Sequence, residues 1–323
     1  MKKILLSLFL LCLPFELLNL LYKNAEYSFG DNDVSRFKNV PHNIQVANSG
    51  NSLGEQMNYE NHPGLTSVKF SLLMQPINCD FQILEQYIDH FSRDSVFYIV
   101  LSYGEVDGIL SEDIYKMIKG RYYQFLKSKY IEDYSIWDKI RYCAIPIVYA
   151  EYPFHKIKQK FFNSAAQENT EEPEEILEAE RGKKCFLQKR LEQDNFMNVF
   201  NRTYPRQKQS GLDYNKNYVI SMAKLCSEHY VHPVVVTPPL PANTVRALEK
   251  TDYFEAFEKL KESILEECKN QNIEIDWLDY NRSEEYMNHE EWFKDPVHLK
   301  DEYCAKYTDD IIKSTNARGR YVF

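Results

Sequence analysis

Glycine is scarce in this chain, at 10 of 323 residues. Glycine-rich loops let a backbone approach phosphate groups closely, and neither G-x-x-x-x-G-K-[ST] nor G-x-G-x-x-G occurs in the sequence. The seven cysteines form no C-x-x-C pair and no zinc-finger spacing with histidine. His289-Glu290-Glu291 lacks a second histidine at helical spacing, so it is not a metal pattern. No cofactor and no metal are therefore expected.

An excess of basic residues is also lacking. The net charge is −9, and 39 Lys and Arg residues are scattered among 48 Asp and Glu residues. Nucleic-acid-binding proteins usually present a basic face, so no nucleic-acid partner is expected. Aromatic residues are plentiful, with 24 Tyr and 19 Phe, and the chain is 44% hydrophobic. This composition fits a packed domain and excludes a disordered chain.

The N-terminus has the composition of a targeting signal. After a Lys-Lys start, an apolar run covers 4–15, Glu16 interrupts it, and it resumes over 17–22. No small-x-small cleavage site follows, so residues 1–24 are interpreted as either a signal peptide or a membrane anchor. The interrupted run is marginal against the ~20 apolar residues of a full crossing. We expect an exported cell-envelope protein, membrane-anchored or secreted. The alternative is a cytosolic protein whose first helix is buried.

Strand and helix patterns alternate along the rest of the chain. Short apolar runs indicate four strands, at 44–47, 95–101, 232–237 and 273–278. Amphipathic periodicity indicates helices, at 80–91, 215–229, 251–269 and 301–312. Such alternation predicts a parallel sheet with helices on both sides, and hence a single α/β domain over 25–323. In sheets of this kind, sites form beyond the carboxyl ends of the strands.

The middle of the chain differs from this pattern. Residues 110–160 are rich in Tyr, Ile and Lys and predict helices, whereas 165–180 is acidic and is typical of a solvated loop or a frayed helix. We interpret about 105–212 as a helical insertion between strands. Both a cap over a site and a plain helical extension are compatible with the sequence.

A small-residue turn follows the first predicted strand, at Asn48-Ser-Gly-Asn-Ser-Leu-Gly54. A nucleophilic serine must project from a sharp turn after a strand, where small neighbours let backbone N–H groups approach a developing oxyanion. Ser52 is the candidate nucleophile, and Ser49 is its rival. An ordinary Asn/Ser/Gly turn is the simpler alternative for this segment alone.

A carboxylate and a histidine lie close together near the C-terminus, in Asp295-Pro-Val-His298-Leu299. A general base must take the proton of the serine and return it later, and a carboxylate at Nδ1 fixes its tautomer. The three-residue offset on one turn lets both side chains converge on one pocket. The alternative is a loop aspartate that caps the next helix, beside a surface histidine.

Together these segments resemble the SGNH/GDSL hydrolase superfamily, in particular exported members that modify cell-surface polysaccharide and teichoic acid. The resemblance is carried by the two segments above and by those at 75–84, 96–103 and 234–239, and it spans roughly 40–315. It implies a flavodoxin-like α/β/α sandwich in which Ser52 is the nucleophile, His298 the base and Asp295 its partner. The implied substrate is an acylated carbohydrate or another ester.

The chain also departs from the family. Leu53 stands where related blocks often have histidine, and the family's separate Gly and Asn blocks are not recognisable. Gln75 and Asn78, in the turn before a helix, are candidate substitutes as oxyanion donors. Two hypotheses follow. One is a serine esterase or O-acyltransferase acting on an envelope glycan, and the other is a weak or inactive envelope protein that binds a glycan or an assembly partner.

Overall fold

The computed structural model describes residues 13–14, 34–144 and 203–319. Nearly all of the expected anchor and the acidic part of the insertion lie outside these residues. The chain divides into two compact units, 39–117 with 186–323 and 1–38 with 118–185. Within the described ranges, no helix has both the length and the apolar character needed to cross a bilayer.

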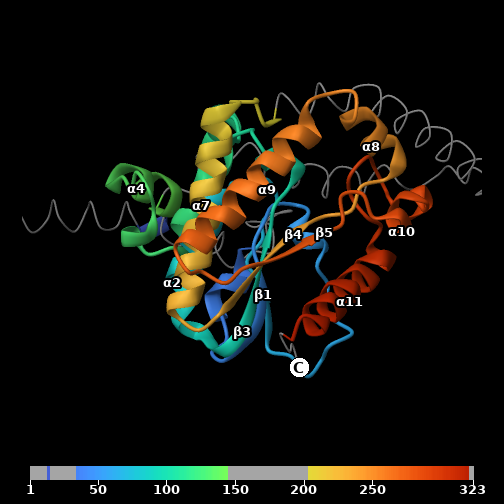
Figure 1. Ribbon diagram of the computed structural model, residues 1–323. Helices are drawn as coiled ribbons and strands as arrows, with labels where there is room; N and C mark the ends of the chain where they lie inside the picture. The colour runs from blue at the N-terminus through green and yellow to red at the C-terminus, as the bar shows by residue number, and fades with distance from the viewer. Residues whose placement is uncertain (1–12, 15–33, 145–202, 320–323) are drawn as a thin grey trace, which may run out of the picture. The chain divides into compact units, whose positions relative to one another are not determined.

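The larger unit is built on a five-stranded sheet in the order β2-β1-β3-β4-β5, with every neighbouring pair parallel (Figure 1). This confirms the predicted parallel α/β sheet, and the order is that of flavodoxin-like folds. The strands are β1 (Ile44–Asn48), β2 (Ser67–Lys69), β3 (Phe91–Val100), β4 (His232–Thr237) and β5 (Asp276–Asp279).

Burial explains which strands were readable from the sequence. In β3, residues 95–100 are all buried, and β4 is buried after its first residue, as their continuous apolar runs indicate. β2 was not predicted, because it has three residues, lies at the sheet edge and buries only its central valine. The strand expected at 273–278 begins three residues later, since 273–275 form the loop that enters β5.

Three helices, α2, α7 and α9, pack side by side on one face of the sheet, and α11 covers the other (Figure 1). α7 begins six residues before the start that its apolar periodicity predicted. The helices of this unit are α2 (Ile77–Tyr87), α7 (Gln209–Glu228), α8 (Ala242–Leu248), α9 (Tyr253–Asn270), α10 (Glu284–Met287) and α11 (Asp301–Ala317), with short 3-10 turns including η3 (Gly54–Gln56) and η5 (Tyr103–Glu105).

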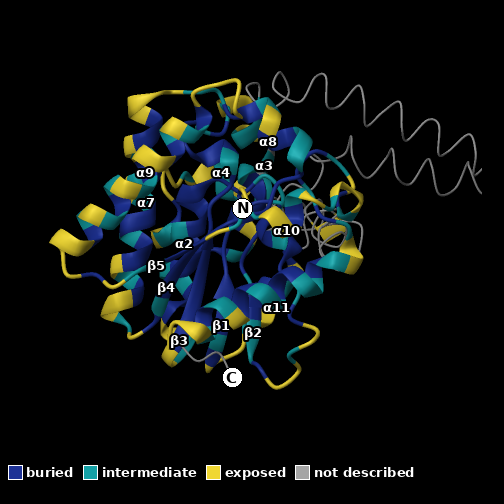
Figure 2. Ribbon diagram, turned by 45° about the vertical axis from the view of Figure 1, so that its right-hand side comes forward, coloured by how far each residue is buried: buried dark blue, intermediate teal, exposed yellow. Residues whose placement is uncertain are grey.

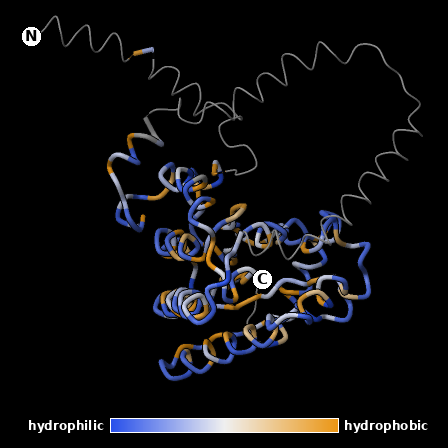
Figure 3. Tube along the Cα trace, turned by 90° about the horizontal axis from the view of Figure 1, so that it is seen from above, coloured by the Kyte–Doolittle hydropathy of each residue, from blue (hydrophilic) through white to orange (hydrophobic). Residues whose placement is uncertain are grey.

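The core of this unit lies between the sheet and its helices. Figure 2 shows the strands as the most continuously buried elements, and hydrophilic and hydrophobic residues alternate along the helices (Figure 3). Cys226, Cys268 and Cys304 are free and buried on inward helix faces, as expected for small apolar side chains. Burial raises the pKa of each of these thiols, so they are not reactive thiolates at neutral pH.

The described part of the smaller unit is helical, as predicted for this stretch. It holds the end of α3 (Glu112–Phe125), α4 (Ile136–Ala144) and the 3-10 turns η2 (Ser35–Asn39) and η6 (Ser128–Tyr130). The rings of Phe37 and Phe125 stack with centroids 4.0 Å apart, and Lys119 Nζ lies 3.1 Å from Asp138 Oδ2. The role of the insertion as a cap or an extension stays a prediction.

Candidate functional site

The serine turn directly follows β1, at the carboxyl edge of the sheet. Ser49 N–H donates to Tyr98 O at 2.9 Å, which extends the pairing with β3 by one residue. Gly50 then adopts φ +113°, a conformation that favours glycine. A Cβ at Gly50 would meet Val100 O at 2.9 Å, so space and backbone conformation both require glycine here. The chain therefore turns sharply away from the sheet just before Ser52.

Two side chains, one just before α2 and one in its first turn, hold the serine turn by hydrogen bonds. Gly50 N–H donates to Asp80 Oδ1 at 2.9 Å, and Gln75 Nε2 donates to the same oxygen at 2.5 Å. Gln75 Nε2 also faces Phe70 O at 2.9 Å and Gly50 O at 3.4 Å. Asp80 and Gln75 are both buried, so their polar atoms strongly favour this one arrangement of the turn.

The two candidate serines of the turn have different surroundings. Ser49 is 0% exposed, and its Oγ has no hydrogen-bond partner among the described residues. Ser52 is partly exposed, and its Oγ lies 2.8 Å from His298 Nε2. Only Ser52 combines access from solvent with a neighbouring base.

The predicted acid and base occupy the tip of a short hairpin after β5. Phe293 and Leu299 form an antiparallel bridge, and Lys294 N–H donates to His298 O at 2.8 Å. At the tip, Asp295 Oδ1 accepts the backbone N–H groups of Val297 at 2.9 Å and His298 at 2.8 Å. Pro296 has no N–H to offer, which suits its place in the turn.

The hairpin brings His298 between Asp295 and Ser52. His298 Nδ1 lies 2.7 Å from Asp295 Oδ2, and Nε2 lies 2.8 Å from Ser52 Oγ. An ionised carboxylate only accepts hydrogen bonds, so Nδ1 carries the proton, and in the neutral ring Nε2 is left to accept from Ser52 O–H. The three residues chosen from the sequence thus form one hydrogen-bonded chain.

Asp295 is held in its ionised form. Burial acts to raise the pKa of Asp295, but the hydrogen bond and charge of His298 and the two backbone N–H groups outweigh burial and lower the pKa below its ordinary range. A carboxylate that stays ionised keeps the His298 tautomer needed at Ser52.

Two hydrogen bonds fix the hairpin to the rest of the unit. Leu299 N–H donates to Gln56 Oε1 in η3 at 3.0 Å, across 243 residues of sequence. Thr244 Oγ1, in α8, donates to Pro296 O at 2.6 Å. The first of these connects the base directly to the segment that follows Ser52.

The structure gives one of the two predicted oxyanion side chains, Gln75, hydrogen-bond partners inside the turn. Gln75 is fully buried, and its amide N–H groups face Asp80 and backbone carbonyls, so it acts as a brace for the turn. Asn78 is buried in the first turn of α2, and its part in the site stays a prediction. The backbone N–H of Ser52 has no acceptor among the described residues, which leaves it available as a donor.

Glu105, which sequence reasoning missed, is a buried carboxyl in η5, five residues after β3 ends. Its Oε2 accepts from Ser102 N–H at 3.1 Å and Ser102 Oγ at 2.8 Å, closing a capping box around η5. Burial raises the pKa of Glu105 to about 7, although the hydrogen bonds from Ser102 act to lower it. The Ser-x-x-Glu spacing of Ser102 and Glu105 is the sequence signal that could have identified this capping box.

Asp80, Gln56 and Asn51 support the site without having been predicted. Their partners lie far away in the sequence, as with the 30 residues between Gly50 and Asp80. Contacts between residues so far apart cannot be predicted from the pattern of neighbouring residues in the sequence. The composition of the small-residue turn was the only available hint for Asn51.

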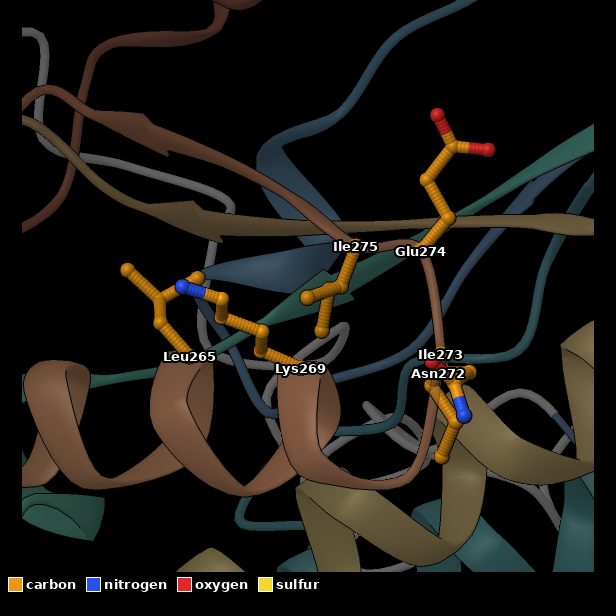
Figure 4. A pocket seen from close by; sticks show the side chains of 6 residues that line it. All are labelled: Leu265, Lys269, Asn272, Ile273, Glu274 and Ile275. Carbon is orange, nitrogen blue, oxygen red and sulfur yellow. The ribbon is translucent and has the colours of Figure 1, made fainter.

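A shallow groove of about 450 Å³ lies between the end of α9 and the loop entering β5, lined by residues that include Leu265 and Lys269 (Figure 4). It faces the amino end of β5, opposite the edge that carries Ser52. Within the described ranges no three His, Cys, Asp or Glu side chains cluster as a metal site would require.

Comparison with models of known protein families gives no match, and comparison with curated proteins gives none either.

Proposed function

We propose that this chain is a serine esterase or O-acyltransferase of the SGNH hydrolase type, acting on acyl esters of a cell-envelope glycan. One observation carries the proposal: His298 bridges Ser52 and Asp295 with hydrogen bonds of 2.8 and 2.7 Å. Residues 246 positions apart form this contact at the carboxyl edge of a parallel sheet, where sites of α/β folds are found.

The proposed reaction begins with attack by Ser52 Oγ on the ester carbonyl carbon. His298 Nε2 takes the serine proton, and Asp295 stabilises the imidazolium that forms. The backbone N–H of Ser52 is the proposed first donor to the oxyanion. Collapse of the tetrahedral intermediate breaks the ester C–O bond, and His298 returns the proton to the leaving alcohol. The acyl group is left on Ser52.

The second half of the reaction defines the product. Water attacking the acyl-enzyme gives hydrolysis, and a sugar hydroxyl gives transfer. His298 serves as base for either acceptor, so the triad supports both outcomes. Product analysis with an acetylated glycan, in the presence and absence of an unacetylated acceptor, distinguishes them.

A fluorophosphonate probe tests the proposal, because it phosphonylates serines that are activated by a base. The wild-type protein is expected to label, and Ser52→Ala is expected to abolish labelling. Ser49→Ala is the matched control, since this buried serine has no neighbouring base, and it should label like wild type. Absence of labelling in the wild type, or equal labelling of Ser52→Ala, would rule out the mechanism.

The second candidate function is a binding protein that retains the fold without efficient catalysis. The engagement of the Gln75 amide with Asp80 and Phe70 O favours it, because this removes one of the predicted oxyanion donors. Loss of one such donor typically lowers the rate by ~10²–10³. A wild-type protein that binds an envelope glycan or an assembly partner but does not label would select this function.

A further inference from the structure

The Asn51 side chain holds the backbone on both sides of Ser52. Asn51 Oδ1 accepts Leu53 N–H at 3.0 Å, so one end of the amide closes a turn over the serine. Its Nδ2 donates to Tyr204 Oη at 3.0 Å, across 153 residues. Asn51 is only 4% exposed, so Tyr204 is needed to satisfy its buried amide N–H.

Tyr204 packs closely against Gly104 and Gly108, in the segment that follows β3. A Cβ at Gly104 would lie 2.6 Å from the Tyr204 ring, and one at Gly108 would lie 2.9 Å from Tyr204 Cβ. A larger residue at Gly104 would collide with the Tyr204 ring, and one at Gly108 would collide with Gly104 O and with Tyr204 Cβ and O. Gly104 therefore leaves the space that the Tyr204 ring occupies, and Gly108 lets the backbone of Tyr204 approach closely.

The backbone around Tyr204 is the returning end of the insertion. Ser111 N–H donates to Thr203 O at 3.0 Å and Gln207 N–H to Asp107 O at 2.8 Å, which joins the two ends of the insertion as a short antiparallel ribbon. Arg206 fixes the ribbon further, since its Nε lies 2.8 Å from Asp107 Oδ2 and its guanidinium also pairs with Asp252.

We infer that Tyr204 is a positioning residue, which couples the base of the insertion to the nucleophile by orienting Asn51 and, through it, Ser52. This inference depends on the proposed function for its catalytic consequence. The hydrogen bond from Asn51 to Tyr204 and the packing of Tyr204 against Gly104 do not depend on that function. A change at the base of the insertion is then transmitted to the reactive serine through one hydroxyl group.

Tyr204→Phe tests the inference because it removes the hydroxyl and keeps the ring packed against Gly104. We expect the fluorophosphonate labelling rate to fall about three- to tenfold, the equivalent of one hydrogen bond. In steady-state ester hydrolysis, kcat should fall while KM is unchanged. Tyr280→Phe is the matched control. It deletes a similar hydrogen bond, of 3.1 Å between Tyr280 Oη and Ser314 Oγ, which does not involve the Ser52 turn.

A double-mutant cycle separates positioning from general loss of stability. If Tyr204 acts through Asn51, the double variant Tyr204→Phe/Asn51→Ala should label no more slowly than Asn51→Ala alone. Additive losses, or an unchanged rate in Tyr204→Phe while Ser52 still labels in the wild type, would overturn the inference and leave the proposed function intact.

Hydrogen exchange gives a readout that needs no enzymatic activity. Tyr204→Phe is expected to speed amide exchange about three- to tenfold in residues 51–54, and Tyr280→Phe is not. If the wild type fails to label, faster exchange in this turn still supports the coupling. Unchanged exchange there would refute it.

Discussion

Ser49 and Ser52 show how much depends on the surroundings of a single side chain. Both are serines in one short turn, but Ser49 is enclosed and Ser52 faces His298. A hydroxyl becomes a useful nucleophile only when a base can take its proton. At the residue scale the candidate site is therefore defined by hydrogen-bond partners, and the residue type alone does not define it.

Glu105 gives a residue-scale prediction about pH. Its pKa in the folded protein is about 7, above the ~4.3 of an exposed glutamate. The folded state therefore binds the proton more tightly, and stability is lost as pH rises through about 7. Glu105→Gln, which keeps an acceptor for Ser102, should be more stable than wild type at pH 8 by up to about 3 kcal/mol.

Urea unfolding at pH 4 and pH 8 measures this difference. At pH 4 the two proteins should differ much less, because Glu105 is then largely protonated in both folded and unfolded states. Parallel pH dependences in wild type and variant would contradict a raised pKa at this position.

At the scale of elements, a hairpin and a turn from opposite ends of the chain must be held together. The link from Leu299 N–H to Gln56 Oε1 does this directly. Both residues are buried, so no water replaces the acceptor if the glutamine side chain is shortened. The approach of His298 to Ser52 therefore also depends on Gln56 and Leu299, which take no part in the proposed reaction.

Gln56→Ala is expected to lower the free energy of unfolding by about 1–3 kcal/mol, the cost of a buried unsatisfied N–H. It should also slow fluorophosphonate labelling, because His298 directly precedes Leu299, whose backbone N–H loses its acceptor. Gln271→Ala is the control, since its amide makes an exposed bond to Glu267 at 2.8 Å. Wild-type stability and labelling in Gln56→Ala would show that the link is dispensable.

At the scale of the molecule, the sheet order explains why the site lies where it does. In the order β2-β1-β3-β4-β5, the connections from β1 and β3 run to opposite sides, and the Ser52 turn follows β1 at this point. The hairpin after β5 reaches the same edge. The described triad, from Ser52 to His298, is contained in the larger unit.

Export and anchoring remain proposals at this scale, with a direct test. If residues 1–24 are a membrane anchor, we expect the full chain in the membrane fraction after alkaline extraction, and removal of these residues should release it. If they are a cleaved signal peptide, we expect the protein outside the cell without them. The shortened protein should still label with the fluorophosphonate, because all three triad residues follow the deleted segment. A soluble cytoplasmic full-length pool would refute the proposed location.

Local patterns predicted the α/β class and the presence of β1, β3, β4 and the four long helices, but β3 begins four residues and α7 six residues before the predicted start. They did not predict β2, which is too short and polar to show a period. In the site, Asp295 and His298 could be paired from spacing, because three residues on one turn keep them in contact in any fold that preserves the turn. Gln75 and Asn78 were chosen by position alone, and burial gave Gln75 another partner.

The acid–base pair and the small-residue turn are properties of local sequence, since contacts over two or three residues follow from backbone geometry. The approach of His298 to Ser52 is different, because 246 residues separate them and no short-range rule acts over that length. It exists because five parallel strands end at one edge and buried hydrogen bonds such as Leu299 to Gln56 fix the last few ångströms. The same reason explains why Tyr204, 153 residues from Asn51, became visible only in the folded chain.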